Sequence, residues 1–299
     1  MIPPISPDPN TPPNILQFNA FNQLSDPAAL SEMLHHMTIT NSHFALLQEQ
    51  GNFLRNPIPS QWRLHISGRV AIIHLSQYHV NIIPDGTTTS DEFDSLEIEV
   101  HLPNKTIFNL CSVYRPPTVN ARHTTSKPLL TYIARHLSNP SNIILGGDMN
   151  IHSTHLGSNT NFPATASRRL WDFIETMESG GCLNNGSPTR IGPPAAIHTQ
   201  TPSAIDITLW NTIDPANFLP TTWTPGTQLR SDHRTILIGA PFLARQDTLR
   251  PSTSPSERTL AYPTDPSPTP NKHLNPCHLS STTKSPSLTS TSKQTTSAN

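Results

Sequence analysis

Hydrophobic positions along the chain form short apolar runs separated by amphipathic segments, which is the pattern of a layered α/β protein. Apolar side chains at three- and four-residue steps predict helices after Asp26, after Ser126 and over 168–177. Segment 96–102 alternates polar and apolar residues, so one of its faces is expected to contact water. The apolar runs predict strands at 14–20, 44–49, 70–75, 96–102, 107–114, 143–145, 203–210 and 235–238.

The run at 143–145 is apolar at every position, which is typical of a strand covered on both faces. Gly146 and Gly147 follow it, and two missing side chains let a ligand or a neighbouring strand come close. Asp148 and Asn150 are two residues apart, so in an extended chain their side chains point toward the same site. The alternative interpretation is an Asx turn that closes the strand without any chemistry.

Composition divides the chain into three parts. A Pro-rich lead occupies 1–13, and 29 of the 49 residues from Pro251 to Asn299 are Pro, Ser or Thr. Such segments have too few apolar side chains to offset the entropy lost on ordering, so we expect disorder at 1–13 and at 241–299. The folded domain is expected at 14–240.

Charge and cysteine usage restrict the classes of function. Residues 1–240 contain 13 Lys and Arg against 17 Asp and Glu, so any nucleic-acid site must depend on a local patch and a bound cation. Cys111, Cys182 and Cys277 are too far apart in sequence for a zinc knuckle or a disulfide framework, and no structural zinc is expected. Without a membrane-length apolar stretch or a signal-peptide pattern, the sequence predicts a soluble intracellular protein.

Polar residues follow the predicted strands, and ligands gather at strand ends in layered α/β proteins. The candidates are Asn19, Glu49, Tyr114 and Asp148. If several carboxylates converge there, each like-charge pair near 4 Å costs about 4 kcal/mol at an effective dielectric of about 20. A divalent cation relieves that repulsion, and oxygen ligands favour Mg²⁺ or Mn²⁺ over zinc.

Two further patterns involve histidine. Asp206 lies between Ile205 and Ile207 in the middle of a predicted strand, where a carboxylate needs a partner. His233 supplies an imidazole that could be that partner. A second pattern, His152-x-x-His155, lies in a loop with no further ligand in register, which favours a structural role over a metal site.

An ordered set of blocks resembles the endonuclease/exonuclease/phosphatase superfamily, and most of all the endonuclease domain of LINE-type (non-LTR) retrotransposon polyproteins. The resemblance covers about residues 14–240 and implies an α/β fold, a four-layer sandwich of two packed β-sheets flanked by helices (DNase I-like / exonuclease III-like). The family usually has a glycine soon after its first asparagine and a phenylalanine where Met149 stands. The blocks are Asn19, Gln48-Glu49, Tyr114, Gly146 to Asn150, Ser203 to Asp206 and Ser231 to His233.

The resemblance implies a role for each matching position. Glu49, with Asn19 and Asp232 close by, would hold the metal. Asp148 would orient or deprotonate the attacking water, and Asn150 would position that water.

The remaining implied roles concern the phosphate. His233, oriented by Asp206, would polarise the scissile phosphate, and Tyr114 would steady its developing charge. Thr189 and Arg190 match positions that touch DNA in the family, although the residues alone favour a plain turn.

The sequence therefore predicts a Mg²⁺-dependent DNA endonuclease that leaves a 3′-hydroxyl for target-primed reverse transcription, and the resemblance implies a nuclear location. Two alternatives remain open. The same fold would also hydrolyse another phosphoester, such as a phosphoinositide, a sphingolipid head group or RNA. In the second alternative, the chain is an inactive retroelement remnant whose Ser/Thr/Pro-rich tail serves as an interaction segment.

Overall fold

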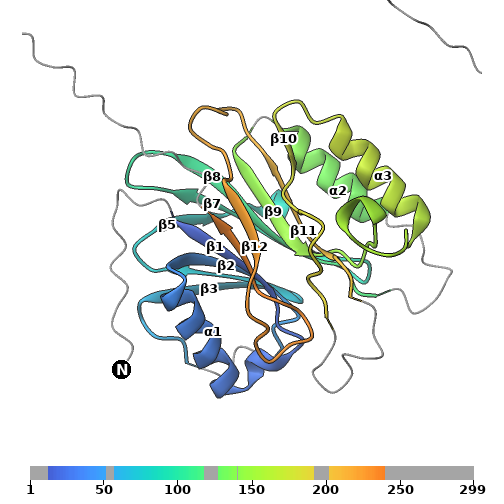
Figure 1. The fold of residues 1–299 in the computed structure, drawn as a ribbon. Coiled ribbons are helices and arrows are strands. Elements are labelled where there is room, and N and C mark those ends of the chain that lie inside the picture. The colour runs from blue at the N-terminus through green and yellow to red at the C-terminus, as the bar shows by residue number, and fades with distance from the viewer. Residues whose placement is uncertain (1–12, 52–56, 118–126, 140, 192–201, 240–299) are drawn as a thin grey trace, which may run out of the picture. The chain divides into compact units, whose positions relative to one another are not determined.

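Two mixed β-sheets pack face to face, and helices cover their outer surfaces (Figure 1). This arrangement confirms the predicted four-layer sandwich. The computed structural model describes residues 13–51, 57–117, 127–139, 141–191 and 202–239. The predictions of disorder at 1–13 and 241–299 therefore lie outside the described residues, apart from Pro13.

The first sheet has the strand order β12-β13-β1-β2-β4-β3, and helix α1 (Pro27–Ile39) packs on it. β1 and β2 are parallel, and the other neighbours in this sheet are antiparallel. The Asp26 side chain caps α1 by accepting a hydrogen bond from Ala28 N–H at 2.9 Å, as the sequence predicts. The strands are β1 (Asn14–Asn19), β2 (Ser42–Gln48), β3 (Trp62–Ser67), β4 (Val70–Leu75), β12 (Thr222–Pro225) and β13 (Ile236–Gly239).

The second sheet has the order β10-β11-β9-β8-β7-β5, with β6 paired to β7. Helices α2 (Lys127–Ser138) and α3 (Ala164–Glu175) cover its outer face. β8 and β9 are parallel neighbours at its centre. The strands are β5 (His79–Ile82), β6 (Thr88–Thr89), β7 (Asp94–His101), β8 (Ile107–Tyr114), β9 (Ile143–Asp148), β10 (Gly180–Cys182) and β11 (Asp206–Asn211). Within the described ranges, three short 3-10 helices lie in the loops: η1 (Gln23–Ser25), η3 (Pro84–Gly86) and η5 (Thr154–Leu156).

The two glycines of β9 allow close packing on both sides. A Cβ added to Gly146 would lie 2.4 Å from Gln17 Oε1 of the facing sheet, and one added to Gly147 would lie 1.7 Å from the Val113 carbonyl oxygen of β8. The predicted close approach is thus present, and neighbouring chain segments make it. Gln17 also accepts a hydrogen bond from Thr208 Oγ1 at 2.7 Å, which ties β1 to β11 across the sandwich.

Two expectations about strands need correction, and four strands had no prediction. Asp206 begins β11 and does not lie in the middle of a strand. The face of β7 expected to be wet is partly covered by α2, and Glu97 on it is buried against His136. The sequence also gave no clear signal for β3, β5, β10 or β12, which are short or flanked by polar residues.

None of the helices among the described residues is long and apolar enough to cross a lipid bilayer.

Candidate active site

Asp148 lies at the end of β9 and uses its two carboxylate oxygens differently. Oδ1 accepts a hydrogen bond from Asn150 N–H at 2.9 Å, which closes the Asx turn considered above. Oδ2 accepts a hydrogen bond from Asn19 Nδ2 at 2.8 Å and lies 3.8 Å from His233 Nε2. The turn and a polar cluster therefore coexist, since each takes one oxygen. Asn150 itself has φ +46° and donates its amide to the Arg115 carbonyl at 2.6 Å.

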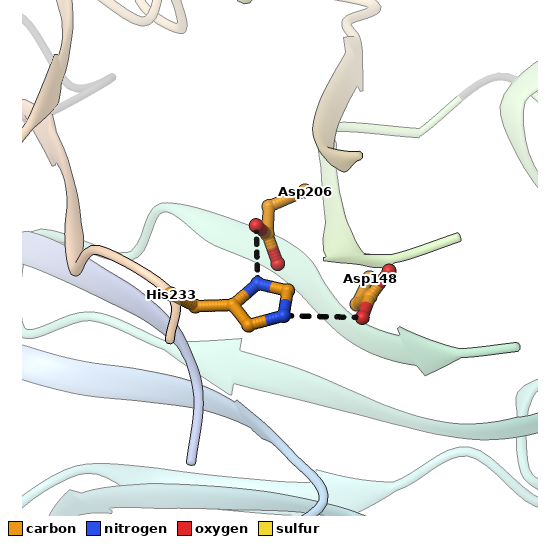
Figure 2. Close-up of side chains that lie close together, drawn as sticks. All are labelled: Asp148, Asp206 and His233. Carbon is orange, nitrogen blue, oxygen red and sulfur yellow. Dashed lines mark hydrogen bonds and ion pairs between the residues drawn. The ribbon is translucent and has the colours of Figure 1, made fainter. Parts of the chain in front are cut away.

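His233 and Asp206 form the buried pair that the sequence predicts. The strand register places Asp206 directly opposite Asp148, and His233 Nδ1 lies 2.7 Å from Asp206 Oδ2. Figure 2 shows the imidazole between the two carboxylates, with one ring nitrogen toward each. His233 is held there because it immediately precedes the segment that enters β13, next to the start of β11.

The electrostatics of this cluster favour a protonated imidazole. Burial alone lowers the pKa of His233, but Asp206, Asp148 and Asp232 outweigh burial and raise that pKa to about 9. Burial and the neighbouring Asp206 raise the pKa of Asp148 to about 7, although His233 and the Asn19 hydrogen bond oppose the rise. The site thus holds an imidazole that stays protonated at neutral pH beside a carboxylate that can exchange protons there.

Glu49 and Asn19 approach Asp148 from the first sheet. Asn19 Nδ2 lies 3.3 Å from Glu49 Oε1 and 2.8 Å from Asp148 Oδ2, so the two carboxylates converge on one polar atom. Glu49 has φ +45°, and strained non-glycine residues of this kind gather at functional sites. The two carboxylates thus share one amide donor, and carboxylate oxygens are the ligand type that Mg²⁺ prefers. Asn19 Oδ1 already accepts a hydrogen bond from Phe21 N–H at 2.9 Å.

A different trio, Asp148, Asp206 and His233, also has ligand atoms close enough for a metal ion. A cation among these three residues would compete with the 2.7 Å contact between His233 Nδ1 and Asp206 Oδ2, so the proposal below places the metal on the Glu49 side.

Asp232 and Tyr114 complete the predicted set. Asp232 Oδ1 is buried, has no hydrogen-bond partner among the described residues and lies 3.7 Å from His233 Nε2. Tyr114 is the register partner of Asp148 across β8 and β9. Burial and a hydrogen bond with Glu49 raise the pKa of Tyr114, so its hydroxyl stays protonated as a donor. Both residues therefore lie at the cluster, as the sequence predicts.

A family model described as "Endonuclease-reverse transcriptase" matches residues 108–237, which include β8, β9, β11 and the His233 segment. The fold and the order of the site residues agree with this match. The match confirms the predicted resemblance to the endonuclease/exonuclease/phosphatase superfamily.

Several solved structures have the same fold. The endonuclease domain of TRAS1, a telomere-specific non-LTR retrotransposon, aligns with a TM-score of 0.58 at 21% identity, over 77% of this chain and 98% of that one. The Xenopus laevis APE2 catalytic domain gives 0.53 at 14% identity, over 76% and 91%. The 3′ phosphatase NExo from Neisseria, bound to a product DNA hairpin, gives 0.52 at 13%, over 76% and 98%. No curated protein sequence matched the chain.

Thr189 and Arg190 lie beside the Asp206–His233 pair. Thr189 is fully buried, and its hydroxyl accepts a hydrogen bond from Asp206 N–H at 3.2 Å, so its side chain has no surface for substrate. Arg190 forms isolated β-bridges with Ser203 and His233, and its Nε lies 2.8 Å from Asp232 Oδ2. The predicted DNA contact therefore rests on Arg190, whose side chain is 38% exposed.

The His-x-x-His pair has aromatic partners. His155 stacks on Trp171 with ring centroids 4.5 Å apart, and His152 meets Phe162 edge to face at 6.4 Å. These contacts agree with the structural role favoured from the sequence.

Arg69 and Asp94 are neighbours of the site that sequence reasoning missed. Arg69 Cζ lies 5.2 Å from the centroid of the Tyr114 ring, and Asp94 is the cross-strand partner of Tyr114. Arg69 follows Gly68, whose φ of +55° marks the turn between β3 and β4. The sequence signal near Arg69 was the glycine before the predicted strand at 70–75. A glycine there indicates a turn and does not identify a functional residue.

Proposed function

We propose that this protein is a divalent-metal-dependent phosphodiesterase that acts as a DNA endonuclease and nicks its target to leave a 3′-hydroxyl for target-primed reverse transcription. The observation that carries the proposal is the position of His233, with its ring nitrogens 2.7 Å from Asp206 and 3.8 Å from Asp148. An imidazolium held against two carboxylates supplies a fixed donor beside a proton acceptor, as phosphodiester hydrolysis requires.

His233 donates a hydrogen bond to a nonbridging oxygen of the scissile phosphate. Asp206 accepts a hydrogen bond from Nδ1–H and so fixes the orientation of the ring, which leaves the Nε2–H for the substrate. With a pKa of about 9, the ring stays protonated at neutral pH and stabilises the charge that develops on the phosphate. Tyr114 donates a second hydrogen bond to the same phosphate.

Asp148 orients and deprotonates the attacking water. Its pKa of about 7 matches that task near neutral pH, because a base works best when its pKa is close to the working pH. Asn19 holds Oδ2 from one side, and the Asx turn to Asn150 holds Oδ1 from the other. The carboxylate is therefore fixed before substrate binds, and Asn150 positions the water.

Glu49, together with Asn19 and Asp232, would hold Mg²⁺ or Mn²⁺. When bound, the ion would supply a Lewis acid that stabilises negative charge on the phosphate. For Asn19 to bind through Oδ1, its amide would exchange the hydrogen bond from Phe21 N–H for the ion. DNA is proposed as the substrate because two of the structural relatives were solved with DNA products.

A plasmid assay tests this function. Conversion of supercoiled to open-circular DNA should require Mg²⁺, stop in EDTA and disappear in Asp148→Ala and His233→Ala. Asp85→Ala and His79→Ala remove the same groups from exposed positions of η3 and β5 and should nick like the wild type. Extension of the nick by a polymerase without prior phosphatase treatment would identify the 3′-hydroxyl. Wild-type rates in both site variants would refute the assignment.

The mildly acidic balance of residues 1–240 favours a second candidate, the hydrolysis of another phosphoester at the same centre. Comparing turnover of DNA, RNA, a phosphoinositide and a sphingolipid head group separates the two. Loss of Asp148 should abolish turnover of whichever substrate is correct. Failure of the wild type to bind Mg²⁺ in calorimetry would instead favour an inactive remnant.

A further inference from the structure

Two arginines near the site share one unusual arrangement. The Nε of Arg69 lies 2.7 Å from Asp94 Oδ2, and the Nε of Arg190 lies 2.8 Å from Asp232 Oδ2. In both pairs the carboxylate is buried, at 1% and 5% exposure, whereas 38% of the arginine side chain is exposed. Each guanidinium is thus held by a buried carboxylate on one side and is exposed to solvent on the other.

Arg69 is tied to the catalytic centre by several contacts. Its carbonyl accepts the hydrogen bond from Glu49 N–H at 2.9 Å, and its guanidinium lies over the Tyr114 ring. Asp94 Oδ2 accepts from both the backbone N–H and the Nε of Arg69, each at 2.7 Å, and Nη2 donates to the Ser90 carbonyl at 2.9 Å. These bonds fix the guanidinium in the folded protein, so little side-chain entropy remains to be lost on binding.

The order of strands places the two arginines on opposite sides of Asp148. Tyr114 of β8, under Arg69, neighbours Asp148 of β9 on one side. Asp206 of β11 neighbours it on the other side, and Arg190 pairs with Ser203, just before that strand. A polymer lying across the ends of β8, β9 and β11 would therefore meet one guanidinium before the reacting centre and one after it.

The negative charge of the site makes positively charged groups on both sides useful for binding a polyanion. The cluster of Glu49, Asp148, Asp206 and Asp232 repels a polyanion, and residues 1–240 carry no excess of basic groups. Arginine binds phosphate with two parallel N–H groups and remains charged at any working pH. Anchored arginines on both sides of an acidic centre can hold a phosphate backbone there without adding charge to the centre itself.

We propose that Arg69 is a nucleic-acid contact residue, which binds a backbone phosphate adjacent to the scissile one on the Tyr114 side of the site. Arg190 is its counterpart on the Asp232 side. The inference rests on the endonuclease function proposed above and names the side of the site over which the substrate backbone runs.

The test is the salt dependence of DNA binding by the full chain. Affinity for a fluorescein-labelled DNA duplex is measured by anisotropy in EDTA over a series of KCl concentrations. Loss of one phosphate contact lowers the magnitude of the slope of log K against log [KCl] by about 0.9. Arg69→Gln should show this decrease and bind roughly tenfold more weakly at low salt. Arg69→Lys keeps the charge and should retain the wild-type slope.

The matched control is Arg135→Gln, which removes one positive charge from α2, where the side chain is 60% exposed and 3.6 Å from Asp85. It should leave the slope unchanged. Asp94 keeps hydrogen bonds from two backbone N–H groups in Arg69→Gln, and thermal unfolding checks the fold. If the variant is unstable, Arg69→Gln with Asp94→Asn removes the buried charge and must show the same decrease.

Two failures are distinguishable. If the wild type nicks plasmid with Mg²⁺ but Arg69→Gln keeps the wild-type slope, the role of Arg69 is wrong and the endonuclease function stands. If the wild type neither nicks nor binds DNA, the proposed function itself is wrong.

Discussion

Two buried histidine–carboxylate pairs are built on the second sheet, one at the strand ends of the site and one beneath helix α2. His233 Nδ1 lies 2.7 Å from Asp206, and His136 Nδ1 lies 2.8 Å from Glu97. All four side chains are at most 7% exposed. The two pairs therefore match in distance and burial, although only the His233–Asp206 contact has hydrogen-bond geometry.

Their surroundings differ. Asp148 and Asp232 lie 3.8 and 3.7 Å from His233 Nε2, so a single imidazole faces three carboxylates. The second pair has neutral neighbours: Asn109 donates to Glu97 Oε1 at 2.7 Å, and the Tyr132 ring lies 4.3 Å from the His136 ring. Excess negative charge at one point attracts a cation, whereas a compensated pair only fills the core. The surplus of carboxylates, and not the buried pair, distinguishes the site.

The largest expected effect is a difference in catalysis between the two pairs. Asp206→Asn keeps the shape of the side chain but removes the charge that orients His233, so the single-turnover nicking rate should fall by roughly 10³-fold. Glu97→Gln is the matched change in the other pair and should leave that rate within about threefold of the wild type. Equal losses in both variants would contradict the distinction.

The second effect is on stability and involves the pair under α2. Glu97→Ala leaves His136 buried without its partner, and the free energy of unfolding in urea should fall by about 3–5 kcal/mol. Replacing both residues, as Glu97→Leu with His136→Leu, should recover most of that loss, because an apolar pair suits the surrounding core. Nicking by the double variant at low temperature should remain. A double variant no more stable than Glu97→Ala would show that the pair has a further role.

The third effect is a dependence of stability on pH with opposite signs for two histidines. His233 has a pKa raised to about 9 by its three carboxylates, against the opposing effect of burial, and burial lowers the pKa of His43 in the first sheet to about 4. The stabilisation from His233 is complete below pH 6.5 and is lost as the pH rises to about 9. His43 favours its neutral form, so its contribution grows from pH 4 to 6.5.

Urea unfolding in EDTA, which removes bound cations, measures both windows. His233→Gln should flatten the decline between pH 6.5 and 9, and His43→Gln should flatten the rise between pH 4 and 6.5. NMR titration of the ring protons checks the assignments. A His233 ring that titrates below pH 6.5 would remove the basis for its role as a donor.

The sequence predicted the elements whose local signals agree with their packing. Strands 70–75 and 107–114 are apolar runs and match β4 and β8, and the Asp26-Pro27 pair begins α1 where capping chemistry places it. The pairing of Asp206 with His233 was predictable because a carboxylate beside apolar neighbours requires a partner. These inferences depend on the residue and its nearest sequence neighbours.

The features that the sequence did not predict depend on contacts between residues that are distant in the chain. The alternation of 96–102 predicts a wet face, but α2 covers Glu97, and no pattern within β7 reveals that helix. Arg69 comes near the site only because β4 lies beside β2 and brings its carbonyl to Glu49. Burial of Thr189 likewise follows from its hydrogen bonds with Ser203 and Asp206, which are distant in sequence.

The smallest expected effect comes from an exposed ion pair next to the site. Arg230 precedes Ser231, Asp232 and His233, and its side chain lies 2.9 Å from Asp26 and 3.0 Å from Glu32 of α1. All three side chains are 44–50% exposed, so water screens the pairs and competes for both partners. Arg230→Gln should therefore change the free energy of unfolding by less than about 1 kcal/mol and leave the nicking rate unchanged. A loss of activity comparable with that of Asp206→Asn would mean that Arg230 fixes the position of the His233 segment. Closeness in sequence to His233 would then predict a residue's effect on activity better than its burial and charge do.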